Sequence, residues 1–348
     1  MILPSEPTPP RWSPHHQRLH RHLLRRPDLL PAGAPLLLAV SGGQDSMALT
    51  ALLADLRRLH GWRLLLWHGD HGWRSDSAAQ ASALAAWAAD QGLPLRLERA
   101  EPPPAGEAAA RQWRYGCLER RALIRGCRHV VTGHTANDRA ETVLLNLARG
   151  SHRLGLASLR AQRPLVRDQD RDAHPPVLLV RPLLPFSRPD TARICLELDL
   201  PVWEDASNGE ARYGRNRIRA EVLPVLEELH PGAARRIAAQ SERLEEDCDA
   251  QAELLGLALE GLATGGGHGL ARRRFARLAA ANRRQLLEHW LRQQGVPSLG
   301  GAALEALSRR LGAGRSPGLL ELADGWRLCW DRSTLELHRL EDPPQADG

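Results

Sequence analysis

Residues 36–46 read LLLAVSGGQDS: a short apolar run meets a glycine turn, and a helical pattern follows at once. Apolar residues then recur at helical spacing over 47–59. A strand, a glycine turn and a helix in this order are typical of open α/β sheets, which bind ligands where a strand meets the next helix. These residues therefore predict a ligand site at the turn.

Outward from this turn, apolar runs and helical patterns alternate, which indicates a parallel, doubly wound α/β sheet. Further strands are expected at 62–67, 93–98, 128–133 and 177–184, and helices at 77–90, 106–125, 137–149 and 189–198. From Tyr213 the pattern is mainly helical, over 215–229, 232–260 and 271–294, with two or three short strands near the end. We expect a basic N-terminal extension (1–34), the α/β domain (35–206) and a mainly helical C-terminal region (207–348).

The composition excludes several classes of protein. All 47 basic residues are Arg, against 41 acidic residues, so there is neither a Schiff-base lysine nor the lysine of a Walker A loop. The five cysteines form no Cys-x-x-Cys pair, which argues against a disulfide framework or a zinc ribbon. With no long apolar stretch and no signal-like start, the sequence predicts a cytoplasmic protein without a membrane segment.

The glycine turn has the chemistry of a phosphate site. Its glycines let backbone N–H groups approach an anion, and the next helix adds its positive end. Asp45 would repel phosphate unless a Mg²⁺ ion lies between them, so the turn predicts a nucleotide together with Mg²⁺ held by Asp45. A simple turn with Ser and Asp as helix caps is the alternative. The expected nucleotide-binding residues are Ser41, Gly42, Gly43, Gln44, Asp45 and Ser46.

SGGQDS resembles the loop of the N-type ATP pyrophosphatases, or PP-loop family, which cleave ATP to AMP and pyrophosphate. Four further segments resemble those of tRNA(Ile)-lysidine synthases: DHGWR at 70–74, ARQWRY at 110–115, GHTANDRAET at 133–142, and SN at 207–208 with YGRNRIR at 213–219. Trp73 stands for the family's Leu, while Thr135 and Asn137 stand for its His and Asp. The resemblance covers about 41–219 and weakens beyond 230.

The resemblance implies a ligase that uses ATP and Mg²⁺ to join free lysine to the wobble cytidine of the CAU-anticodon isoleucine tRNA, through an adenylated cytidine. The product, lysidine, changes the codon that the tRNA reads from Met to Ile. A homodimer is one oligomeric state that the sequence leaves open. The implied catalytic residues are Asp45, Arg111, His134, Asp138 and Glu141, and the implied substrate or tRNA contacts are Asp70, Arg114, Arg215, Arg217 and Arg219.

Within this set, Arg111 and His134 would stabilise charge on the α-phosphate. Because an Asn cannot act as a base, the proton of the lysine ammonium would pass to Asp138 or Glu141 rather than to residue 137. Thr135 and Asp138 also have the spacing of a helix capping box, which is a purely structural alternative.

Two other readings remain open on the sequence. One is a tRNA-binding protein that has lost its nucleotide chemistry, suggested by Thr135 and Asn137. The other is a PP-loop adenylating enzyme with a different nucleophile; a sulfur-inserting enzyme would need paired cysteines, and none are suitably spaced. A second basic group is a weaker candidate for the tRNA surface: Arg272, Arg273, Arg274, Arg277, Arg283 and Arg284.

Overall fold

The computed structural model describes residues 12–74, 76–165, 175–203, 214–264 and 269–339. Contacts divide the chain into Met1–Glu245 and Glu246–Gly348, not at the boundary of 206 and 207 that the sequence pattern suggests. Packing explains the difference, because Leu223 and Ala234 share a small core with Ala140 of the first unit. The segments Ser207-Asn208 and Tyr213 lie outside the described residues.

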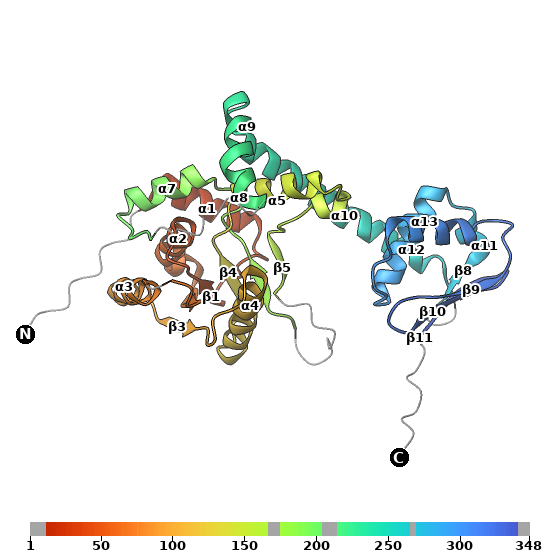
Figure 1. Ribbon diagram of the computed structural model, residues 1–348, viewed down its shortest axis with the longest axis horizontal. Coiled ribbons are helices and arrows are strands. Elements are labelled where there is room, and N and C mark those ends of the chain that lie inside the picture. The colour runs from red at the N-terminus through yellow and green to blue at the C-terminus, as the bar shows by residue number, and fades with distance from the viewer. Residues whose placement is uncertain (1–11, 75, 166–174, 204–213, 265–268, 340–348) are drawn as a thin grey trace, which may run out of the picture. The chain divides into compact units, whose positions relative to one another are not determined.

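The first unit contains a six-stranded sheet in the order β3-β2-β1-β4-β6-β5 (Figure 1). Five strands are parallel: β1 (Pro35–Ala39), β2 (Arg63–Asp70), β3 (Leu95–Arg99), β4 (His129–Thr132) and β6 (Leu178–Val180). The short β5 (Gln162–Pro164) is antiparallel to β6 and was not anticipated from the sequence. The predicted doubly wound α/β fold is confirmed, and the strand order reverses direction between β1 and β4.

Helices cover both faces of this sheet because neighbouring residues of each strand point to opposite sides. Leu36 and Leu38 pack in the larger core, whereas Leu37 packs in the other one, against α4. The helices of this part are α2 (Gln44–His60), α3 (Ser77–Asp90), α4 (Glu107–Ile124), α5 (Ala136–Ala148), α6 (Arg153–Leu156) and α7 (Arg188–Glu197).

Residues 14–25, which fall within the expected basic N-terminal extension, pack against the α/β unit instead of extending into solvent. A capping box at Ser13 begins helix α1 (Pro14–Arg25), whose Leu19 and Leu23 are buried in the larger core. The buried His16 lies 2.9 Å from Asp55 of α2 through its Nε2. Residues 14–25 therefore belong to the α/β unit, because their apolar face completes its core.

The chain continues through α8 (Gly214–Arg217), the π-helical turn η2 (Ile218–Val222), α9 (Leu223–Leu229) and α10 (Ala233–Glu260). The second unit combines α11 (Arg272–Ala276), α12 (Ala280–Gln293) and α13 (Gly301–Arg310) with an antiparallel sheet of β7 (Ala263–Thr264), β8 (Gly269–Ala271), β9 (Gly318–Glu321), β10 (Trp326–Trp330) and β11 (Thr334–Arg339). No helix among the described residues has the length and apolar character needed to cross a membrane.

The prediction of a single helix over 271–294 is wrong, because the chain forms the two helices α11 and α12 there. Arg283 donates to the carbonyl of Leu278 at 2.6 Å, where the chain turns between α11 and α12. This break lets Phe275 and Leu287 enter the same core. Arg272 also turns inward, to backbone carbonyls of Asp331 and Arg315, so it is not part of a basic surface.

Replacing Leu19 by Ala tests whether α1 is part of the domain. Leu19 is fully buried whereas Leu24, on the same helix, is 62% exposed. We expect Leu19→Ala to lower the free energy of unfolding by about 2–5 kcal/mol in urea denaturation, and Leu24→Ala to change it by less than about 0.5 kcal/mol. Equal stabilities for the two variants would contradict the packing of α1.

Candidate active site

The predicted phosphate loop lies where the strand order reverses. The residues after β1 form it, and those after β4 flank it, so two strand ends border one crevice in the manner of doubly wound sheets. Gly43 caps α2 without any side-chain hydrogen bond, which leaves the first amides of a 17-residue helix facing the loop. Gly42 has a positive φ of 85°, and a Cβ there would lie 2.9 Å from the ring of Trp203.

Gly133 allows the second strand end to approach this loop closely. A Cβ at Gly133 would lie 2.7 Å from the backbone oxygen of Asp45, nearer than packed atoms allow. Only glycine therefore lets the start of α5 and the start of α2 meet at one place. This contact brings the predicted segments 41–46 and 133–142 together.

Helix α7 braces the phosphate loop from outside. The hydroxyl of Thr191 donates to Asp45 at 2.5 Å and accepts from the side-chain amide of Gln44 at 2.7 Å. Gln44 also donates to the backbone oxygen of Arg188 at 2.8 Å. Burial raises the pKa of Asp45, against the hydrogen bond from Thr191 and the charge of Arg188. Asp45 is thus a desolvated carboxylate that forms no ion pair with any described residue.

Asn137, which departs from the family pattern, ties α5 to the same brace. Its side-chain oxygen accepts from the backbone N–H of Arg188 at 2.9 Å, at the start of α7. An amide oxygen makes this contact as well as a carboxylate does. In this structure Asn137 is therefore a connecting residue.

Asp138 and Glu141 lie inside a cluster of four charges. Arg215 donates to Glu141 and to Asp138, each at 2.8 Å, and Arg219 donates to Glu141 at 2.7 Å. The side chain of Glu141 is fully buried. Asp138 also accepts from the backbone N–H and hydroxyl of Thr135, which completes the predicted capping box. We call Asp138, Glu141, Arg215 and Arg219 the ion cluster.

The ion cluster changes what was expected of these residues. Arg215 and Arg219 face interior carboxylates rather than a tRNA surface, because the buried Glu141 requires paired charges. Arg217 is exposed and pairs with Glu221 on the same helical stretch. Burial alone would raise the pKa of Asp138, but its interaction with His134, the charges of Arg215 and Arg219, and the N–H of Thr135 hold that pKa below its ordinary value.

His134 and Arg111 differ in charge state. Burial lowers the pKa of His134 to about 3, so its ring is neutral near pH 7 and can offer a hydrogen bond but no positive charge. Its Nδ1 lies 2.9 Å from the hydroxyl of Thr132. Arg111 is exposed on α4, with its guanidinium 5.1 Å from the ring centre of Tyr115. Of these two residues, Arg111 therefore offers a positive charge and His134 a neutral ring.

Asp70 and Arg114 have mainly local surroundings. Asp70 is buried and accepts from the N–H of Gly72 at 2.7 Å and the hydroxyl of Ser77 at 3.0 Å, so it holds the turn after β2. Arg114 is partly buried, and its Nε has no partner among the described atoms. Burial lowers the pKa of Arg114. The contacts of Asp70 are those of an ordinary turn between a strand and a loop.

Sequence reasoning missed Thr191, and it did not single out Arg163 on β5 or Arg181 after β6. Arg181 directly follows the apolar strand β6, so its place at the carboxyl edge of the sheet could have been read from VLLVR at 177–181. No local signal marks Thr191, because its contact with Asp45 joins residues 146 positions apart.

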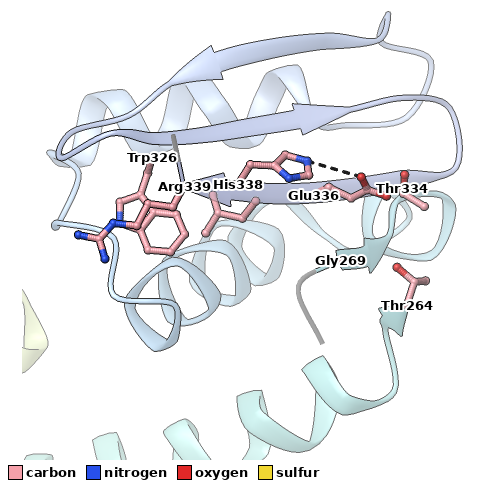
Figure 2. A pocket seen from close by; sticks show the side chains of 8 residues that line it. Thr264, Gly269, Trp326, Thr334, Glu336, His338 and Arg339 are labelled. Carbon is pink, nitrogen blue, oxygen red and sulfur yellow. Dashed lines mark ion pairs between the residues drawn. The ribbon is translucent and has the colours of Figure 1, made fainter. Parts of the chain in front are cut away.

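The second unit has a cavity of about 700 Å³ (Figure 2). Figure 2 shows His338 directed toward Glu336, with Nε2 and Oε2 3.6 Å apart, and Arg339 beside Trp326. The guanidinium of Arg339 lies 5.8 Å from the ring centre of Trp326. None of the site residues expected from the sequence lines this cavity.

Thr191→Val tests the brace on Asp45. Removing the hydroxyl removes a hydrogen bond that favours the ionised carboxylate, so the pKa of Asp45 should rise further. Titration of the Asp45 carboxyl carbon by NMR measures this, with Thr191→Ser as the matched control that keeps the wild-type value. An Asp45 that titrates identically in the Val and Ser variants would refute the brace.

Glu141→Gln tests the ion cluster. The substitution leaves two guanidinium groups without their buried partner, which should lower the free energy of unfolding by about 3–5 kcal/mol in urea denaturation. Glu221→Gln removes an exposed partner of Arg217 and should leave the urea midpoint close to that of the wild type, because solvent screens an exposed ion pair. Similar losses in both variants would show that the ion cluster is no stronger than a surface pair.

Comparisons with known proteins agree with this architecture. A family model described as a PP-loop domain matches residues 15–226. The tRNA(Ile)-lysidine synthase of Parasynechococcus marenigrum (strain WH8102) is 52% identical over 96% of this chain and 96% of its own length. That of Prochlorococcus marinus (strain SARG) is 41% identical over 94% of this chain and 96% of its own length.

Among solved structures, the U34-tRNA thiolase NcsA from Methanococcus maripaludis with its [4Fe-4S] cluster superposes with a TM-score of 0.55. At 19% identity over 66% of this chain and 78% of that one, the likeness concerns the fold. Together with the loop at the strand reversal and the near full-length relatives, the PP-loop match shows that this chain belongs to the tRNA(Ile)-lysidine synthase family.

Proposed function

We propose that this protein is a ligase that joins lysine to the wobble cytidine of the CAU-anticodon isoleucine tRNA, with cleavage of ATP to AMP and pyrophosphate. The observation that carries the proposal is the phosphate loop at the strand reversal, in a chain related over 96% of its length to a tRNA(Ile)-lysidine synthase. The oxygen at the 2-position of cytosine leaves poorly, so ATP would first convert it to an adenylate, which the amine of lysine displaces.

The loop supports the ATP step. Its glycines and the uncapped start of α2 suit a chain of phosphates. Asp45 suits Mg²⁺, because it is a partly buried carboxylate that forms no ion pair with any described residue, so that the charge of Arg188 acts on it only from a distance. No three metal-binding side chains gather in the described part of the chain, so the ion would take its other ligands from phosphate and water. Bound there, Mg²⁺ would neutralise charge on the phosphates.

Arg111 and His134 are the proposed groups on the α-phosphate. Arg111 would contribute positive charge, and the neutral His134 would contribute a hydrogen bond as charge builds up in the transition state. This division of roles follows from the burial of His134.

Asp138 and Glu141 stay candidates for the proton of the lysine ammonium, with a condition that the ion cluster imposes. Both carboxylates are occupied by arginines, so either would have to release an arginine contact before it could accept a proton. The positively charged ammonium of lysine could take the place of the released arginine, so the carboxylate would keep a cationic partner. Arg215 and Arg219 then act on the substrate through the carboxylates that they hold.

The proposal is tested with radiolabelled lysine, ATP, Mg²⁺ and either of two CAU-anticodon tRNAs, for isoleucine or for methionine. We expect stable label on the isoleucine tRNA alone, surviving mild alkaline deacylation. Asp45→Asn should reduce label by at least about 10²-fold, since the metal ligand is lost, while Asp28→Asn, an exposed change in another loop, should not. ATP cleavage with tRNA but no label would favour another nucleophile, and binding without cleavage would favour a tRNA-binding protein.

A further inference from the structure

Two arginines lie over the ring of one tyrosine, and a third arginine, which follows β6, interacts with all three electrostatically. Arg111 and Tyr115 lie on α4, Arg163 lies on β5, and Arg181 follows β6. The guanidinium carbons of Arg111 and Arg163 lie 5.1 and 5.4 Å from the ring centre of Tyr115. We call Arg111, Arg163 and Arg181 the arginine cluster.

Arg181 is the buried member of the arginine cluster. Its side chain is among the largest that are fully enclosed, with 1% of its surface exposed. One nitrogen, Nη1, donates to the carbonyl of Arg160 at 2.6 Å, whereas Nε has no partner among the described atoms. Burial, and then the charges of Arg163 and Arg111, lower its pKa to about 10. A guanidinium remains protonated at pH 7 under these conditions, with a donor unused.

No described carboxylate pairs with any member of the arginine cluster. Toward the described residues, Arg163 donates through Nη1 to the carbonyls of Pro164 and Leu165. In the ion cluster, by contrast, two arginines face two carboxylates. The ring of Tyr115 offsets part of the repulsion, since a cation–π contact contributes about 0.5–2 kcal/mol. The remaining positive charge favours an anion as the missing partner.

We propose that Arg163 and Arg181 of the arginine cluster bind a backbone phosphate of the tRNA beside the cytidine that is modified, while Arg111 keeps its proposed role on the α-phosphate; the inference rests on the proposed function. Arg163 is partly buried, so a polymer can place one phosphate against it from solvent, with the charge of the enclosed Arg181 behind it. Guanidinium forks match phosphate oxygens in pairs. The sheet order puts β4 between this site and the loop at the end of β1, so a second anion can bind beside ATP.

Arg163→Gln is the sharpest variant, because Arg163 is only partly buried and its removal leaves the enclosed Arg181 in place. Arg58→Gln is the matched control: it removes the same charge from an exposed position near the end of α2. With the full-length protein and isoleucine tRNA, we expect Arg163→Gln to weaken binding about tenfold, the loss that about 1.4 kcal/mol represents. Arg163→Lys should recover part of it.

Salt dependence separates a lost phosphate contact from a general defect. The slope of log affinity against log salt concentration should fall by about 0.7–0.9 in Arg163→Gln and stay at the wild-type value in Arg58→Gln. Binding of ATP and of free lysine, measured by equilibrium dialysis, should be unchanged. Arg181→Gln should show the same loss of slope at temperatures where its circular dichroism is that of the wild type.

Two outcomes would overturn the assignment. One is an equal tRNA affinity and slope in Arg163→Gln and Arg58→Gln. The other is that Arg163→Gln loses binding of ATP or lysine while its tRNA binding stays intact. This result would mean that the arginine cluster binds a small-molecule anion. These measurements are independent of lysine transfer: if the wild type attaches no lysine, the proposed function fails, while the comparison of the two variants still decides whether this cluster holds an RNA phosphate.

Discussion

The ion cluster is the interaction on which the arrangement of the first unit depends. Glu141 is enclosed on α5, and its charge is stable there because Arg215 and Arg219 reach it from α8 and η2. The same contacts attach the residues after 214 to the sheet, together with the bond from Arg139 to Glu245 on α10. A segment that looks like the start of a separate helical domain is thereby part of the catalytic one.

Two groups of arginines use the same side chain for opposite purposes. In the ion cluster the arginines pair with carboxylates of the protein itself, and their main effect is to hold these carboxylates near the phosphate loop. In the arginine cluster the charge is left over, since backbone carbonyls and the ring of Tyr115 are the partners present among the described residues. The distinction is invisible in a sequence where every basic residue is Arg.

The sequence predicted the sheet and the loop because both depend on local patterns. Apolar runs of four or five residues specify the strands, and the glycines at 42 and 43 specify the turn. It failed where the deciding contact is distant. Arg215 and Arg219 pair with residues more than 70 positions away, and Thr191 reaches Asp45 across 146 positions. Likewise α1 was misjudged because charge is visible in a sequence, whereas the core that buries Leu19 is not.

The brace from α7 has a thermodynamic consequence. Thr191 fixes both Gln44 and Asp45 in the free protein, and Ser46 closes the loop through its contacts with Ser41 and the carbonyl of Gly43. Ordering a loop residue costs about 1–2 kcal/mol of conformational entropy, which a nucleotide arriving here does not have to supply. The nucleotide should therefore bind as a ligand binds to a rigid receptor, because the loop residues are already ordered when the protein has folded.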